Sequence, residues 1–128
     1  ERFIDILAIC HTIIAEEKDG ALVYNASSPD ELALTNAARY FGITFKERDE
    51  NFNMVIHNKF TNKISKYELL NVIEFTSSRK RMSVIVRTPD DRIICMTKGA
   101  DSIIIPRLAK GQDKLINETS KYCSRSQC

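Results

Sequence analysis

The stretch YELLNVIEFTSSRKRMSVIVRTPDDRIICMT, residues 67–97, carries the strongest β-sheet signal in the chain. Residues 67–75 form one apolar run. In residues 82–87, Met, Val and Val alternate with Ser, Ile and Arg, which is the period of a strand with one buried face. Residues 92–97 form a third run, and Thr-Pro-Asp-Asp at 88–91 is a turn sequence. The stretch therefore predicts three strands, of which the last two form a hairpin.

An amphipathic helix is predicted at the start of the chain, because apolar residues recur there every three or four positions. The stripe that this helix would bury consists of Phe3, Ile6, Leu7, Cys10 and Ile14. His11 lies beside the stripe and is expected to be a packing residue with satisfied hydrogen bonds. After a polar break at 16–20, residues 21–24 predict a short strand.

The segment Ser27-Ser28-Pro29-Asp30-Glu31 contains the signals that begin a helix. Ser28 is a suitable N-cap, Pro29 suits the first helical position, and Glu31 completes a capping box by reaching back to the Ser28 amide. This helix is predicted to continue to Phe41 and to end at Gly42, which tolerates a left-handed backbone.

The other segments complete an α+β pattern. Strands are predicted at 43–45 and 53–56 around a charged turn, followed by a loop at 57–63. Beyond Gly99 we expect a short helix that Pro106 ends or kinks, a final helix at 112–119, and a frayed or truncated tail at 120–128. Residues 1–128 are thus predicted to form a single α+β domain, with a mostly antiparallel sheet flanked by helices.

The composition argues against several kinds of protein. The 19 basic and 17 acidic residues give a net charge of only +2, so no global field points to nucleic acid or an anionic membrane, and any basic site must be local. No apolar run approaches the roughly 20 residues that cross a bilayer. The 4 cysteines show no Cys-x-x-Cys spacing. We therefore expect reduced thiols in a cytosolic setting, and no metal site.

Three segments are candidates for chemistry. They are Ser28-Pro29-Asp30-Glu31, the sequence EFTSSRKRMS at 74–83, and Thr97-Lys98-Gly99-Ala100-Asp101. Taken singly, the first is explained by helix capping and the second by a solvated turn. In the third, a strand brings a lysine to a glycine, where backbone can approach a ligand closely. Glycine-rich phosphate loops and hydrolytic triads do not occur in the sequence.

Taken together and in this order, the three segments resemble the nucleotide-binding domain of P-type ATPases. The resemblance spans residues 7–108 and includes LAICHT at 7–12 and YELLNVIEF at 67–75. The run RKRMSV at 79–84 and the aspartate at 101 are similar to phospholipid flippases, the type IV members. Cation pumps of the same superfamily typically follow Lys-Gly-Ala with Pro-Glu, so a cation pump is the less favoured alternative.

This resemblance implies a site for ATP. Phe75 would stack on adenine, Glu31 would accept its amino group, Lys98 would lie beside the nucleotide, and the pocket would be completed by Ser77, Lys80 and Gly99. These roles agree with general chemistry, because aromatic rings stack on bases, carboxylates are pure acceptors and ammonium groups attract phosphates.

The resemblance also implies that the chain is a fragment of a larger membrane ATPase. The phosphorylated-aspartate motif Asp-Lys-Thr-Gly-Thr is absent from these residues. A separate phosphorylation domain would supply that aspartate and hold Mg²⁺, so the fragment alone should be inactive. The expected partners are that domain and the membrane helices of the same protein, with an accessory subunit as a further candidate, and the fragment would lie on the cytosolic side. An arginine that contacts nucleotide in relatives would fall beyond residue 128.

Two alternatives come from other classes of protein. One is a module that binds nucleic acid or another anionic partner through Arg79, Lys80 and Arg81, and the other is a structural domain without a ligand. A single Phe75 beside one basic cluster fits a mononucleotide better than a nucleic-acid strand, which needs several stacking platforms. We therefore expect no nucleic-acid partner.

Overall fold

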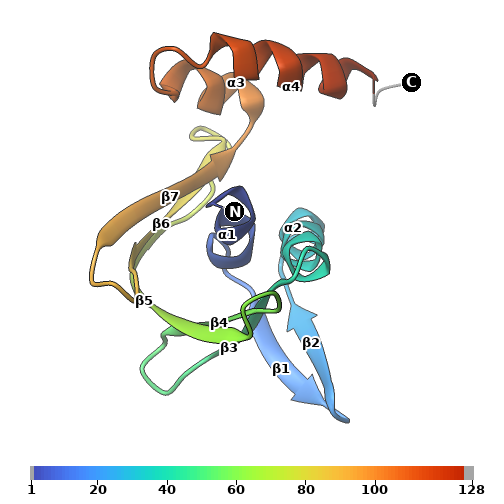
Figure 1. The fold of residues 1–128 in the computed structure, drawn as a ribbon, viewed down its shortest axis with the longest axis vertical. Helices are drawn as coiled ribbons and strands as arrows, with labels where there is room; N and C mark the ends of the chain where they lie inside the picture. Colours follow the sequence, from blue (N-terminus) through green and yellow to red (C-terminus); the bar gives the residue numbers. More distant parts are fainter. Residues whose placement is uncertain (1, 126–128) are drawn as a thin grey trace. The chain divides into compact units, whose positions relative to one another are not determined.

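The computed structural model describes the backbone of residues 2–125 and the side chains of residues 3–121. The chain falls into two compact units, one ending at Lys98 and the other beginning at Gly99 (Figure 1). Each unit is described by itself. The expectation of a single domain over residues 1–128 stays a prediction.

The first unit is built on a five-stranded sheet whose strands follow one another in sequence order, β3-β4-β5-β6-β7. The pairs β3–β4, β4–β5 and β5–β6 are antiparallel. The strands are β3 (Ile43–Arg48), β4 (Met54–Asn58), β5 (Lys63–Ile73), β6 (Arg81–Arg87) and β7 (Ile93–Gly99). Helices and a mostly antiparallel sheet confirm the predicted α+β class.

The strands expected between residues 43 and 97 all exist, with shifted ends. β3 and β4 extend beyond 43–45 and 53–56, and β5 runs from Lys63 to Ile73 instead of 67–75. The predicted loop at 57–63 is therefore shorter and covers 59–62. In β6, Met82, Val84 and Val86 are buried as the alternation predicts, but Ser83, which the alternation places on the other face, is buried too.

A second sheet consists of the hairpin β1 (Ile14–Lys18) and β2 (Ala21–Asn25). The prediction of a polar break at 16–20 is wrong, because only Asp19 and Gly20 form the turn, both with positive φ. Most of β1 is exposed. A strand that buries neither face fully can be polar throughout, and so it shows no apolar alternation.

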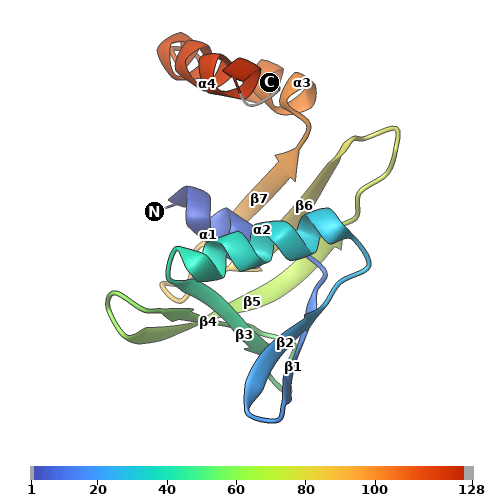
Figure 2. The same cartoon turned by 90° about the vertical axis from the view of Figure 1, so that its right-hand side faces the viewer.

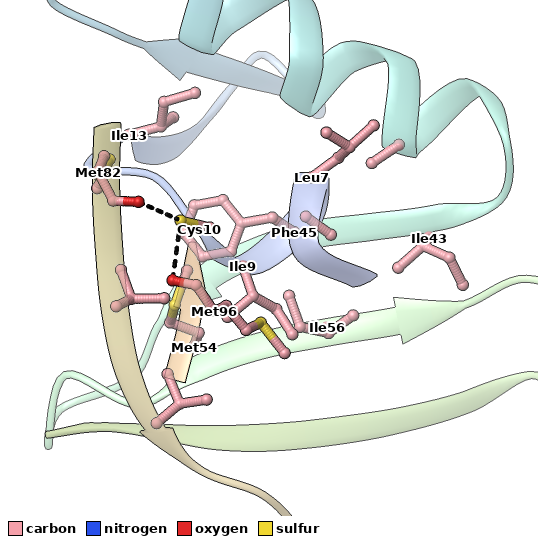
Figure 3. Close-up of a cluster of buried hydrophobic side chains, with 14 of the residues drawn as sticks. Leu7, Ile9, Cys10, Ile13, Ile43, Phe45, Met54, Ile56, Met82 and Met96 are labelled. Atoms are coloured by element: carbon pink, nitrogen blue, oxygen red, sulfur yellow. Dashed lines mark hydrogen bonds between the residues drawn. The ribbon is translucent and has the colours of Figure 1, made fainter. Parts of the chain in front are cut away.

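Helices α1 (Arg2–Ile9) and α2 (Pro29–Tyr40) both lie against the concave face of the curved sheet (Figures 1 and 2). Side chains from α1 and the segment after it meet the sheet in one core (Figure 3). The largest fully buried side chains of the sheet include Phe45, Met54, Val84 and Val86.

The predicted N-terminal stripe is only partly correct. α1 ends at Ile9, Ile14 belongs to β1, and both Phe3 and Ile14 are exposed. The residues that are buried are consecutive, Leu7 to Cys10. Because α1 packs on both α2 and β3, its end is covered on more than one side, and a single helical stripe no longer describes it.

The beginning of α2 follows the prediction except for its capping box. Ser28 is the N-cap residue and Pro29 is the first helical residue, but Ser28 makes no side-chain capping bond. The Glu31 carboxylate bonds to Thr12 rather than to the Ser28 amide, as described below. At the other end, Gly42 has φ +90° as predicted, and a Cβ there would lie 2.7 Å from the Phe60 ring.

The second unit contains α3 (Asp101–Ile104), a 3₁₀ turn (Ile105–Arg107) and α4 (Asp113–Arg125). Pro106 lies in the 3₁₀ turn and ends the α-helix as predicted. α4 confirms the final helix but continues past Thr119 to Arg125, so this part of the predicted tail is helical, and residues 126–128 lie outside the described residues. Among the described residues, no helix is long and apolar enough to span a bilayer.

Candidate functional site

Two of the three candidate segments leave the sheet at the same end. Ile73, the last residue of β5, pairs with Ser83 of β6, and the Ser83 hydroxyl lies 2.8 Å from the Thr97 hydroxyl of β7. These three residues therefore form a row across the sheet. The β5–β6 connector, residues 74–80, begins just beyond this row, and Lys98 follows Thr97 at the same end.

The third candidate segment is brought to this end by α2. Glu31, in the first turn of α2, places Oε1 3.7 Å from Nζ of Lys98, and both side chains are more than four-fifths buried. At 3.7 Å the contact is an ion pair without a hydrogen bond. Two candidate residues that are 67 positions apart in the sequence (98 − 31) are thus brought together.

Lys98 has unused hydrogen-bonding capacity. Its Nζ is buried and has no hydrogen-bond partner among the residues that the structure describes. A buried ammonium group without acceptors is costly, because the water that it loses on folding is not replaced. An acceptor on a ligand at this position would compensate that cost.

The Glu31 carboxylate is held by Thr12, in the segment after α1. The Thr12 backbone N–H donates to Oε1 at 3.3 Å, and the Thr12 hydroxyl donates to Oε2 at 3.0 Å. Thr12 is not among the site residues that the sequence predicts, although it is the last residue of the segment LAICHT at 7–12. Its role is evident only from its hydrogen bonds to Glu31, which is 19 residues away, and no local sequence pattern predicts such a contact.

The connector presents the other candidates on the surface. Phe75 is 61% exposed, and Ser77 and Lys80 are also exposed. Lys80 has φ +52°, and its N–H closes a turn on the Thr76 carbonyl at 2.8 Å. The phenyl ring does not pack in the core and is thus available to a ligand.

Arg79 has a different role from the lysine beside it. Its Nη1 donates to the carbonyl oxygens of Ile73, Glu74 and Arg81 at 3.3, 3.0 and 3.2 Å. The guanidinium group therefore stabilises the two ends of the connector. The sequence shows three consecutive cations at 79–81 but not that one of them is used in this way.

Gly99 is the last residue of β7 and is exposed. It follows Lys98 directly, and it also begins the second unit. Its predicted contact with nucleotide stays a prediction.

Two buried titratable groups lie on the segment before Thr12. Burial lowers the pKa of His11 to about 3. Burial raises the pKa of the Cys10 thiol to about 11, opposed by the nearby Lys98 ammonium. Both groups are therefore neutral near pH 7, and His11 confirms the prediction of a satisfied packing residue: Nε2 donates to the Ala8 carbonyl at 2.8 Å and Nδ1 accepts from the Ile13 N–H at 3.1 Å.

A hollow of the surface lies at the other end of β6 and has a volume of about 500 Å³. Arg87 and Glu68 in its lining are 3.0 Å apart, and Lys66 is 3.2 Å from Asp49. Its charged groups are thus already paired with one another. The Lys98 end of the sheet is the better candidate site, because a buried cation there has no hydrogen-bond acceptor within the part of the chain that the structure describes.

Comparison with known proteins agrees with the motifs. Residues 1–120 match the family model described as P-type ATPase, cytoplasmic domain N. The chain is 44% identical over 121 residues to a phospholipid-transporting ATPase of Schizosaccharomyces pombe, covering 94% of this chain and 9% of that protein. It is 49% identical over 106 residues to phospholipid-transporting ATPase IC of Xenopus tropicalis, covering 83% and 8%.

Phospholipid-transporting ATPase ID of Homo sapiens is 44% identical over 121 residues, covering 94% of this chain and 10% of that protein. The chain thus spans about a tenth of the length of these relatives. The match over 120 of 128 residues, together with the fold, shows that the chain belongs to the P-type ATPase cytoplasmic N-domain family.

Proposed function

We propose that this chain binds ATP at the Lys98 end of its sheet, as the nucleotide-binding module of a phospholipid-translocating P-type ATPase. The observation that carries the proposal is the Lys98–Glu31 pair, whose ammonium group is buried and has no hydrogen-bond partner among the described residues. Such a group is suited to acceptors on a nucleotide.

The donors and acceptors at this end of the sheet match the parts of ATP. The Glu31 carboxylate accepts the amino group of adenine, and the exposed Phe75 ring stacks on the base. Lys80 and Ser77, both exposed on the connector, face the polar part of the nucleotide, and Gly99 leaves room beside Lys98. One carboxylate with two ammonium groups suits a base and phosphates better than a metal ion, which needs several oxygen ligands. We therefore assign Mg²⁺ to another domain.

In the whole enzyme, the module would present the γ-phosphate to an aspartate on a separate phosphorylation domain. Phosphorylation of that aspartate and its reversal would drive phospholipid movement through membrane helices, and an accessory subunit is a further candidate partner. The relatives named as phospholipid-transporting ATPases support this assignment over a cation pump. The module would lie on the cytosolic side, and alone it would not hydrolyse ATP.

The nucleic-acid alternative is weakened by the connector. Arg79 donates to three backbone carbonyls, and Arg81 Nη1 donates to the Arg79 carbonyl at 3.0 Å. Two of the three consecutive cations thus make bonds within the connector, and Phe75 is the aromatic residue beside them. A phosphate backbone would need a broader array of cations and stacking rings.

Titration of the ¹⁵N-labelled chain with ATP, GTP and a short single-stranded DNA, followed by NMR, tests the proposal. We expect ATP to shift the amide signals of Thr12, Glu31, Lys98 and the connector, while GTP and DNA have much weaker effects at equal concentration. Equal responses to ATP and GTP, or a response confined to DNA, would contradict it.

A further inference from the structure

We propose that Thr12 is a positioning residue that orients the Glu31 carboxylate and thereby makes the site select adenine over guanine. This inference rests on the proposed function. It assigns a role to a residue that does not itself need to touch the nucleotide.

The geometry of Thr12 is that of a clamp on the carboxylate. One residue donates to both oxygens, through its N–H at 3.3 Å and its hydroxyl at 3.0 Å. Two donors from one residue restrict the rotation of the carboxylate about its terminal bond, which is otherwise broad. Glu31 therefore keeps one orientation before any ligand arrives.

The segment that carries Thr12 is itself fixed by the core. The buried His11 ring bonds to the Ala8 carbonyl on one side and to the Ile13 N–H on the other, so it bridges the residues on both sides of Thr12. The Cys10 thiol lies 3.8 and 3.6 Å from the carbonyl oxygens of Met82 and Met96, between strands β6 and β7 (Figure 3). Thr12 is exposed and yet rigidly placed, which a positioning residue requires.

Selectivity follows from the acceptors that remain on the carboxylate. An ionised carboxylate has about four lone-pair sites. Thr12 uses one on each oxygen, and Lys98 lies 3.7 Å from Oε1, so Oε2 keeps an acceptor site. Adenine carries an amino donor at its six-position and guanine carries an oxygen there. A fixed carboxylate attracts the first and repels the second, whereas a freely rotating one discriminates less.

The test compares Thr12→Val, which removes the hydroxyl and keeps the N–H, with Thr12→Ser, which keeps both. Dissociation constants for ATP and GTP are measured on the whole 128-residue chain by NMR titration, with a thermal melt of each variant. Thr61→Val, an exposed threonine in the turn before β5 and so at the far end of that strand, is the matched control. Phe75→Ala reports on the ATP site itself.

We expect Thr12→Val to weaken ATP binding about five- to tenfold, which is within the range of one lost hydrogen bond, and to change GTP binding less than about twofold. Thr12→Ser and Thr61→Val should bind both nucleotides like the parent chain. The readout is the ATP-to-GTP ratio, which a merely structural role would not move. Thr12→Ala, which also lacks the hydroxyl, should give the same ratio and serves if the valine variant is poorly folded.

Three results would overturn the inference. If Thr12→Val binds ATP like the parent while Phe75→Ala weakens binding, Thr12 has no positioning role and the ATP site stands. Equal losses for ATP and GTP would mean that the substitution disturbs the site generally. If the parent does not bind ATP, or Phe75→Ala leaves binding unchanged, the proposed function itself fails.

Discussion

Glu31 illustrates how a side chain with an adequate local explanation can have a different role. Its position three residues after Ser28 matches a capping box, yet its carboxylate contacts Thr12 and Lys98 instead. The local pattern concerns residues within one turn, whereas the observed partners are 19 and 67 positions away. A side chain in the first turn of a helix can satisfy either arrangement, and only the packing of α2 against its neighbours decides between them.

Glu31→Gln tests this arrangement. Glutamine has nearly the same shape but an NH₂ group in place of one oxygen, so it no longer offers Thr12 an acceptor at both oxygen positions, and it leaves Lys98 without a counter-charge. We expect a loss of about 1–3 kcal/mol in the free energy of unfolding, measured by urea denaturation, and ATP binding weakened roughly tenfold. Asp30→Asn, the neighbouring exposed acid in the first turn, is the control and should retain ATP binding. If Glu31→Gln matches the parent in both measurements, Glu31 is neither a partner of Lys98 nor an adenine acceptor.

His11 predicts how stability depends on pH. Its pKa is about 3 in the folded chain, and an unfolded histidine titrates near 6.5. Between these values the unfolded state binds a proton that the folded state excludes, so stability is full above pH 6.5 and falls as the pH is lowered toward 3. From pH 7 to pH 5 the loss should be about 2 kcal/mol. Urea denaturation at both pH values measures it.

The other histidine provides the matched control for that measurement. His57→Asn, on β4, should keep the loss between pH 7 and pH 5, whereas His11→Asn should be less stable at pH 7 and show little further change. A parent chain that is equally stable at both pH values would show that His11 is readily protonated when folded.

The β5–β6 connector shows how an element can be ordered and still expose a large aromatic ring. Arg79 ties its two ends together, and the Thr76 hydroxyl accepts from the Arg79 N–H at 3.1 Å. The backbone that carries Phe75 is therefore ordered while its ring stays exposed. Pre-organisation of the connector lowers the entropic cost of binding, because the ligand need not order the backbone there.

Phe75→Ala should separate binding from stability. Base stacking on an aromatic ring contributes about 1–3 kcal/mol, so we expect ATP affinity to fall roughly tenfold or more. Because the ring is 61% exposed, the melting temperature should change little. Phe52→Ala, which truncates an exposed phenylalanine between β3 and β4, is the control and should leave binding intact. A large drop in melting temperature with unchanged ATP binding would contradict this role and indicate that Phe75 stabilises the fold instead.

The elements that the sequence predicts well are those that bury one face. β6 alternates because its Met82, Val84 and Val86 face the core, and α2 has clear signals at both ends. The sequence pattern does not predict β1, because this strand buries little of its surface. It predicts a longer helix than α1, because the end of α1 is covered on several sides. Hydrophobic periodicity indicates an element with a single buried face, and it does not predict elements that are exposed or that are buried on more than one side.

The candidate site was predicted to a different extent from the fold. The order of three motifs marked Glu31, Phe75 and Lys98, and the structure brings Glu31 and Lys98 into contact. The motifs do not indicate Thr12, because its partner Glu31 is distant in the sequence. They also do not distinguish the role of Arg79 from that of Lys80, since both are cations in one run. Which cation of a basic run binds the backbone depends on which carbonyl oxygens lie within hydrogen-bonding distance of it in the folded chain.

For the molecule as a whole, the proposed site offers few contacts, and the residues that the structure describes include no cluster of metal ligands, which sets an expectation for its affinity. A stacked ring, one amine acceptor and a pair of ammonium groups should together give a net of about 4–5 kcal/mol, which corresponds to a dissociation constant near millimolar. Weak binding would suit the proposed role, in which the nucleotide is released after each phosphoryl transfer. The contacts proposed to the base would not involve Mg²⁺.

We therefore expect the 128-residue chain to bind ATP at about millimolar affinity, with nearly the same dissociation constant in Mg²⁺ and in a chelator. Isothermal titration calorimetry or NMR titration under both conditions measures this. Added salt should weaken binding only modestly, because much of the affinity would come from stacking and from nucleotide contacts of the largely buried Glu31 and Lys98 side chains, which salt screens little. Lys80→Asn, which suits the left-handed backbone at residue 80, should remove part of that salt dependence. Nanomolar affinity, or binding that requires Mg²⁺, would mean that the phosphates are held by groups other than those proposed.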